Sequence, residues 1–134
     1  VVINDTSKTQ YLFRINKGRE EAQESINEYM PEAARPIPFG HMLYIGDGLT
    51  DVPCMTVTKN NGGFSVAVHN PRAPKSIETC RALALANRID YFAAADYRAG
   101  KPLEKRVRTI LDIIIARVQF EREKHAFQRE LTDT

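Results

Sequence analysis

Residues 42–51 read MLYIGDGLTD, and this stretch decides the fold. Its first four residues are apolar without interruption, which is typical of a strand that is covered on both faces of a parallel sheet. Two glycines then flank Asp47 and predict a tight turn. A helix is expected to follow, from Thr50 or Asp51 to Lys59. A buried strand that passes through a turn into a helix is the repeating unit of α/β folds.

The same alternation continues toward the C-terminus. The run FSVAV at 64–68 predicts a second strand, residues 74–87 predict a helix, and 91–94 predict a third short strand. Strands that alternate with helices are joined by right-handed crossovers, so we expect one α/β unit with a parallel sheet and flanking helices. We expect one partial domain over 1–134.

The sequence before the 42–45 strand predicts helices. The first is expected to begin near Ser7, which is available as a cap, and to stop at Gly18. A second helical stretch is expected over about 19–29. Residues 1–3 are β-prone but short.

A long helix is expected at the end, over 102–131, with Pro102 as its first residue. Apolar residues at helical spacing form one stripe: Leu103, Val107, Ile110, Ile114 and Val118. A second stripe has its members seven residues apart and consists of Ile113, Phe120 and Phe127. Thirty residues of helix span about 45 Å, which exceeds the width of a small domain. The distal part is therefore either a solvated end or a contact with a partner or a second copy.

Composition limits the possible functions. The chain has 134 residues, 43% of them hydrophobic, and a net charge of +2. This composition is typical of a globular domain, and no apolar run is long enough for a membrane span. The basic excess is too small to predict nucleic-acid binding. Cys54 and Cys80 lack metal-binding spacing, so we interpret them as small buried residues in a reducing cytoplasm.

The turn after the 42–45 strand is the best candidate site. In open α/β sheets, ligands bind beyond the carboxyl ends of the strands, where Asp47 is expected. Gly46 and Gly48 allow the backbone to approach a ligand closely. Asp51 follows about one turn later, and two neighbouring carboxylates offer the oxygen ligands that Mg²⁺ prefers. The alternative is a purely structural turn, stabilised by Asp47, in which Asp51 caps the helix.

Lys8 near a helix start, the apolar strand at 42–45 and the GDGLTD turn at 46–51 together resemble the haloacid dehalogenase-like hydrolase superfamily, phosphatase type. The later strands at 64–68 and 91–94 and the closing helix follow that family's order. The resemblance implies the C-terminal half of a Rossmann-like parallel sheet.

The resemblance also implies a chemistry. Members hydrolyse small phosphorylated substrates through an aspartyl-phosphate, with Mg²⁺ as cofactor. Carried over, Asp47 would bind Mg²⁺ directly or through water, and Asp51 would be a second ligand or orient metal-bound water. Lys8 would be the catalytic cation that pairs with the nucleophile and the phosphate. Lys17 is less suited to that role, because it precedes Gly18, where the helix is expected to end.

The family's first motif, DxDx[TV], supplies the nucleophile and is not found in this sequence. The Ser/Thr motif that binds the phosphate is also absent. We therefore expect a portion of a phosphohydrolase that is inactive alone. In the family, the strand that carries the first motif lies beside the strand that corresponds to 42–45. Without it, this edge of the sheet is open, so we expect a homodimer or a complementing N-terminal half. The alternative function is a non-catalytic interaction module that binds a partner through the helix at 102–131.

Other polar residues carry weaker expectations. His41, His69 and His125 are scattered and predict no metal site, although His69 could line the crevice. Arg98 and Lys101 follow the third strand and could contact substrate there.

Overall fold

The computed structural model describes residues 5–18 and 36–133. Within them lies a parallel sheet of three strands in the order β1 (Leu43–Gly46), β2 (Phe64–His69), β3 (Tyr91–Ala94). The α/β class and the parallel sheet are thus confirmed, and each strand lies within one residue of its predicted position.

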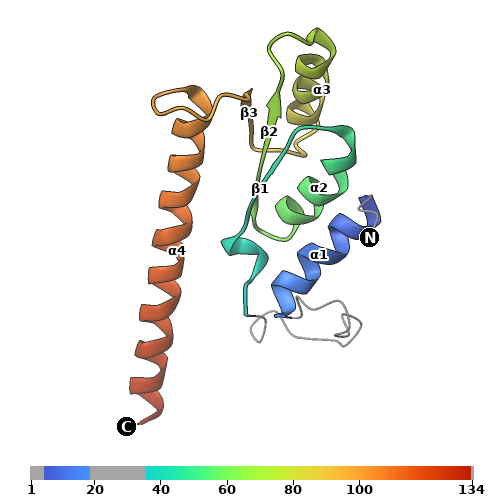
Figure 1. The fold of residues 1–134 in the computed structure, drawn as a ribbon. Coiled ribbons are helices and arrows are strands. Elements are labelled where there is room, and N and C mark those ends of the chain that lie inside the picture. The colour runs from blue at the N-terminus through green and yellow to red at the C-terminus, as the bar shows by residue number, and fades with distance from the viewer. Residues whose placement is uncertain (1–4, 19–35, 134) are drawn as a thin grey trace.

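Helices surround this sheet. They are α1 (Asp5–Lys17), α2 (Val52–Asn60), α3 (Pro74–Leu85) and α4 (Pro102–Thr132), with short 3₁₀ turns η2 (Phe39–His41) and η3 (Leu49–Asp51). Figure 1 shows three layers, in which α1, α2 and α3 lie on one side of the sheet and α4 lies on the other. None of the helices in the described ranges is long and apolar enough to cross a membrane.

The central strand explains this layering. Four consecutive residues of β2, from Ser65 to Val68, are buried, so both faces of the strand need a cover. On one face Val66 and Val68 pack with Leu103 and Ile110 of α4. On the other face Ala67 packs among residues of α2 and α3. A continuous apolar strand in a parallel sheet requires this double cover.

The register of the sheet places the strand tips together. Leu43 lies opposite Phe64, and Val66 lies opposite Tyr91. Gly46, Ala67 and Phe92 therefore lie close to one another, near the carboxyl edge. The turn that follows Gly46 begins at this edge, where ligands of open α/β sheets bind.

The N-terminal helix differs from the expected one at its start and agrees with it at its end. The helix α1 begins at Asp5, so Ser7 lies inside the helix and the prediction of a Ser7 cap was wrong. A side chain alone does not fix a helix start, because earlier residues can also adopt helical geometry. Gly18 follows α1 with a φ of +70°, as expected for a helix stop. The strand at 1–3 and the helix at 19–29 lie outside the described residues.

Helix α4 has a buried and an exposed apolar stripe. In the first stripe Leu103 and Ile110 are 1% exposed, with Val107 and Ile114 packed beside them. In the second stripe Ile113, Phe120 and Phe127 are 43%, 62% and 50% exposed. The first stripe is therefore the core contact of the helix.

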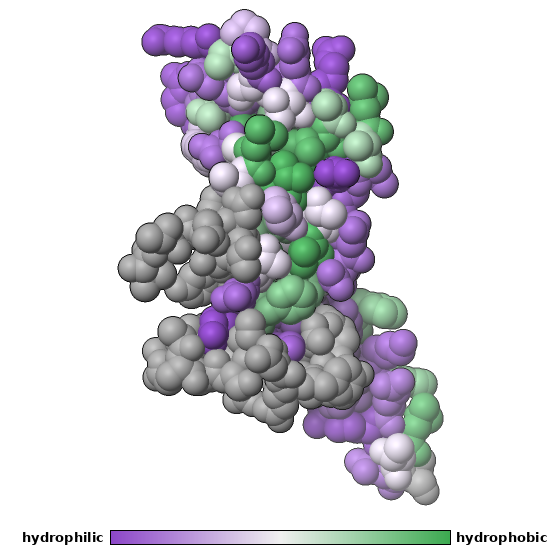
Figure 2. All heavy atoms as spheres, turned by 90° about the vertical axis from the view of Figure 1, so that its right-hand side faces the viewer, coloured by the Kyte–Doolittle hydropathy of each residue, from purple (hydrophilic) through white to green (hydrophobic). Residues whose placement is uncertain are grey.

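Polar contacts hold the middle of α4 against the amino ends of the strands, at the end of the sheet that lies opposite the turn. The Arg117 guanidinium donates hydrogen bonds to the carbonyls of Gly40 (2.8 Å) and Gly62 (2.9 Å). Glu121 pairs with His41 at 2.7 Å. Beyond these contacts the helix continues past the other described helices and strands (Figure 1). Its end shows apolar surface beside polar surface (Figure 2).

Candidate functional site

The turn after β1 is organised by the carboxylate of Asp51. This side chain is 7% exposed, and its Oδ2 accepts hydrogen bonds from the backbone N–H groups of Asp47 (3.1 Å) and Gly48 (3.2 Å). Its Oδ1 accepts a hydrogen bond of 2.6 Å from the hydroxyl of Tyr44. A carboxylate that reaches back to the N–H groups at the start of a helix satisfies donors that the helix itself leaves unpaired.

Tyr44 is a member of this site that the sequence did not indicate. Burial of the phenol, followed by its hydrogen bond to Asp51, raises the pKa of Tyr44 above its usual range. The hydroxyl therefore keeps its proton and serves as a donor to the carboxylate. Alternation along the strand is the one signal that could have found it, since Tyr44 faces the α2 side of the sheet.

The two glycines of the turn have different roles. A Cβ at Gly46 would lie 2.6 Å from Cβ and 2.9 Å from Cγ of Asp51, so only glycine leaves room for that carboxylate. A Cβ at Gly48 would meet nothing closer than the Thr50 hydroxyl at 4.0 Å, and its φ is −143°. Glycine is thus required at Gly46 by packing, whereas the geometry at Gly48 suits other residues.

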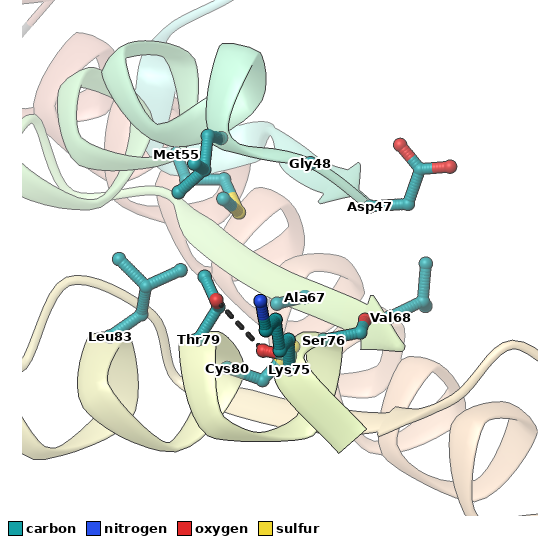
Figure 3. Close-up of a pocket in the computed structure, with 11 residues that line it drawn as sticks. Asp47, Gly48, Met55, Ala67, Val68, Lys75, Ser76, Thr79, Cys80 and Leu83 are labelled. Atoms are coloured by element: carbon teal, nitrogen blue, oxygen red, sulfur yellow. Dashed lines mark hydrogen bonds between the residues drawn. The ribbon is translucent and has the colours of Figure 1, made fainter. Parts of the chain in front are cut away.

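Asp47 is the exposed acidic group of the turn. Its carboxylate has no hydrogen-bond or ion-pair partner among the residues that the structure describes, and Figure 3 shows it directed away from the apolar side chains below. It lines a shallow depression at the carboxyl ends of the strands, together with Val68 at the end of β2 and Tyr97 in the loop after β3.

The donor set at this turn fits one direct carboxylate ligand for a divalent cation, with a second carboxylate that positions it. Asp47 is free to coordinate, and Mg²⁺ usually keeps several waters beside one or two carboxylates. Asp51 already accepts three hydrogen bonds, which favours the outer-shell role over direct ligation. Within residues 5–18 and 36–133 no three His, Cys, Asp or Glu side chains form a group that could hold a metal.

The remaining candidates are more dispersed. Lys8 lies in the first turns of α1, but its side chain is outside the part of the chain whose side chains the structure describes. His41 pairs with Glu121 at 2.7 Å, away from the turn. His69 ends β2, where its ring packs against Phe92 at 6.0 Å. Of these candidates, the described side chains of His41 and His69 have separate partners and are not brought together at the turn.

The loop after β3 contains an ion pair close to the depression. The Arg98 guanidinium donates two hydrogen bonds to Asp96, at 2.9 and 2.7 Å, and its backbone N–H donates a third at 3.2 Å. These bonds lower the pKa of Asp96 to about 2. Arg98 is therefore engaged by its own loop, while Lys101 is exposed.

Comparison with known proteins adds a relative but no activity. No protein-family model matches the chain, and no solved structure matches it. An uncharacterized protein of Borreliella burgdorferi is 35% identical over 106 residues, which cover 75% of this chain and 34% of that protein. The chain thus spans about one third of the length of the curated relative that it matches.

A pair of alanine substitutions tests the packing role of the first glycine. Gly46→Ala should displace Asp51 and break its three hydrogen bonds, lowering the free energy of unfolding by about 1–3 kcal/mol. Gly48→Ala is the matched control and should change it by less than about 0.5 kcal/mol. Urea denaturation of the two variants measures both values. Equal losses would contradict the assignment of the close contact to Gly46.

The ion pair after β3 predicts a specific titration. Arg98→Ala removes the two guanidinium bonds, so the pKa of Asp96 should rise from about 2 toward the ordinary value of about 3.9. Because the folded-state pKa is depressed, the pair stabilises the protein above pH 4 or so, and this contribution is lost as the pH falls through about 2. Carboxyl-detected NMR follows the titration directly. An unchanged Asp96 pKa would remove Arg98 as its cause.

Proposed function

We propose that this chain is part of a Mg²⁺-dependent phosphohydrolase that hydrolyses phosphate monoesters. The observation that carries the proposal is the turn at the carboxyl edge of a parallel sheet, in which a buried Asp51 holds an exposed Asp47. The resemblance of Lys8 and residues 46–51 to the phosphatases of the haloacid dehalogenase-like superfamily supports it. The nucleophile is proposed to lie in another part of the complete enzyme, so the isolated chain is inactive.

In this proposal the residues of the turn have separate tasks. Asp47 binds Mg²⁺, and Asp51 fixes the backbone that carries Asp47. Tyr44 keeps the Asp51 carboxylate in place through its hydroxyl hydrogen bond. When bound, Mg²⁺ would neutralise charge on the transferring phosphoryl group. Lys8 would supply a second positive charge beside the phosphate.

The open edge of the sheet supports the view that this chain acts with a further segment. No described strand pairs with the outer edge of β1, and Ile45 on that edge is 37% exposed. A groove of about 290 Å³ lies beside it, with apolar walls from Leu103, Val107 and Leu111 of α4. Unpaired strand edges that are flanked by apolar surface favour pairing with another strand. A complementing N-terminal half or a second copy is the proposed neighbour.

Replacing Asp47 by Asn in the complete enzyme tests the metal role. The substitution keeps the size of the side chain and removes its charge, so Mg²⁺ binding should weaken at least about tenfold and turnover of p-nitrophenyl phosphate should fall. Magnesium titrations of the hydrolysis rate measure both effects. Asp112→Asn, on the exposed side of α4, is the matched control and should behave like the native enzyme. Unchanged rates at saturating and limiting Mg²⁺ would eliminate Asp47 from the mechanism.

A second candidate function is an interaction module that uses the end of α4. The observation that favours it is the exposed second stripe, Ile113, Phe120 and Phe127. Phe120 lies between Arg117 and Glu121, which hold the helix, and Phe127 follows them. A solvated helix end has no need of large apolar residues at a fixed spacing.

Removing residues 119–134 distinguishes the two functions. The shortened chain keeps Arg117 and the buried stripe, so the sheet and the turn should remain folded. Under the phosphatase proposal, Mg²⁺ should still shift the NMR signals of the Gly46 and Gly48 amides. Under the alternative, self-association measured by sedimentation should disappear with the helix end. Unchanged self-association in the shortened chain would assign the contact to another surface, such as the open edge of β1, and would contradict self-association through the helix end.

A further inference from the structure

A separate cavity of about 200 Å³ opens beside the turn, between α2, β2 and α3. It shares Asp47 and Gly48 with the turn at its mouth and extends inward over the sheet. Figure 3 shows the strand β2 forming one wall and α3 forming the other. Its size is below the ~300–1,000 Å³ of pockets that hold drug-sized molecules, so only a small group fits.

Most of the lining of this cavity, here called its floor, is apolar and contains no aromatic ring. It is formed by Met55, Ala67, Val68, Cys80 and Leu83. All but Leu83 are at most 4% exposed, so the floor belongs to the folded core. Burial raises the pKa of the Cys80 thiol, which therefore stays neutral and acts as one more apolar contact. A short aliphatic group is the complement of such a floor.

One positive charge accompanies this floor. Lys75, from the first turn of α3, lines the cavity, and in Figure 3 its side chain extends from α3 toward β2. Its ammonium has no carboxylate partner among the described residues. Ser76 beside it accepts a hydrogen bond from the Asn70 N–H and keeps its own proton for donation. Thr79 donates its proton to the Lys75 carbonyl, so Lys75 and Ser76 are the available donors.

The charges of the cavity are thus divided along its length. Asp47 lies at the mouth, where the proposed function places the phosphate and its cation, and Lys75 lies on the α3 wall. We propose that the cavity receives the organic part of the substrate, and that this part is a short aliphatic group that carries a carboxylate. The proposal rests on the proposed function: the phosphate end lies at Asp47 and the carboxylate end pairs with Lys75.

Titration with two small probes tests the cavity without catalysis. Butyrate and butyramide have the same shape, and only butyrate carries the charge that Lys75 would recognise. With methionine methyl groups labelled for NMR, butyrate should shift the Met55 signal and saturate it in the millimolar range. The Met42 signal should not move, because Met42 packs on the other side of α2 with Leu12 and Phe39.

Variants identify the charge that is responsible. Lys75→Gln should weaken butyrate binding about threefold to tenfold and leave butyramide binding within about twofold, which also shows that the cavity is intact. Lys105→Gln, an exposed lysine of α4, is the matched control and should bind butyrate normally. The inference is overturned if Met55 does not respond, if the two probes bind equally, or if both variants lose the same affinity.

The same sample separates this inference from the function on which it rests. Addition of Mg²⁺ reports on the turn through the amide signals of Gly46 and Gly48. A Mg²⁺ response without butyrate binding would overturn the cavity and leave the phosphohydrolase. Butyrate binding that depends on Lys75, without a Mg²⁺ response, would keep a small-carboxylate site and overturn the assignment of its ligand as part of a phosphate ester.

Discussion

The site depends on one buried carboxylate beneath one glycine. One carboxylate oxygen of Asp51 accepts hydrogen bonds from the backbone N–H groups of Asp47 and Gly48, and the other accepts one from the Tyr44 hydroxyl. It can approach this closely only because Gly46 has no side chain. A carboxylate buried to this degree is stable only when its oxygens are satisfied, so the turn, the strand and the start of the next helix constrain one another. The exposed position of Asp47 follows from this arrangement.

Much of the fold could be predicted from the sequence, because the strongest signals were local. Unbroken apolar runs located the strands, and Pro102 with the stripe from Leu103 located the start of α4. The burial of Asp51 and the exposure of Asp47 could not be predicted, since their spacing brings both to one turn without indicating which one faces inward. The cavity at Lys75 was also missed, because it requires three elements to meet in space.

The proposed site also explains why the two acidic residues need different surroundings. A group that holds a cation must keep free lone pairs and access to water, as the exposed Asp47 does. A group that fixes geometry must have few alternative conformations, as the hydrogen-bonded Asp51 does. Of the structural interpretation, the stabilising role of Asp51 remains, whereas the expectation that the Asp47 side chain stabilises the turn was wrong, because its carboxylate has no described partner. An Asp47 that is free of the turn is compatible with the metal interpretation.

The attachment of α4 has a consequence for the order of folding. Arg117 bonds to carbonyls that lie 55 and 77 residues earlier, and Glu121 pairs with a histidine 80 residues earlier. During synthesis β1, β2 and β3 leave the ribosome before this helix does, so Val66 and Val68 lack their cover on that face until it arrives. Contacts across such long separations form late, because closing the intervening chain is entropically costly. A nascent sheet that forms before α4 is complete would have one apolar face open to chaperones and to other unfinished chains.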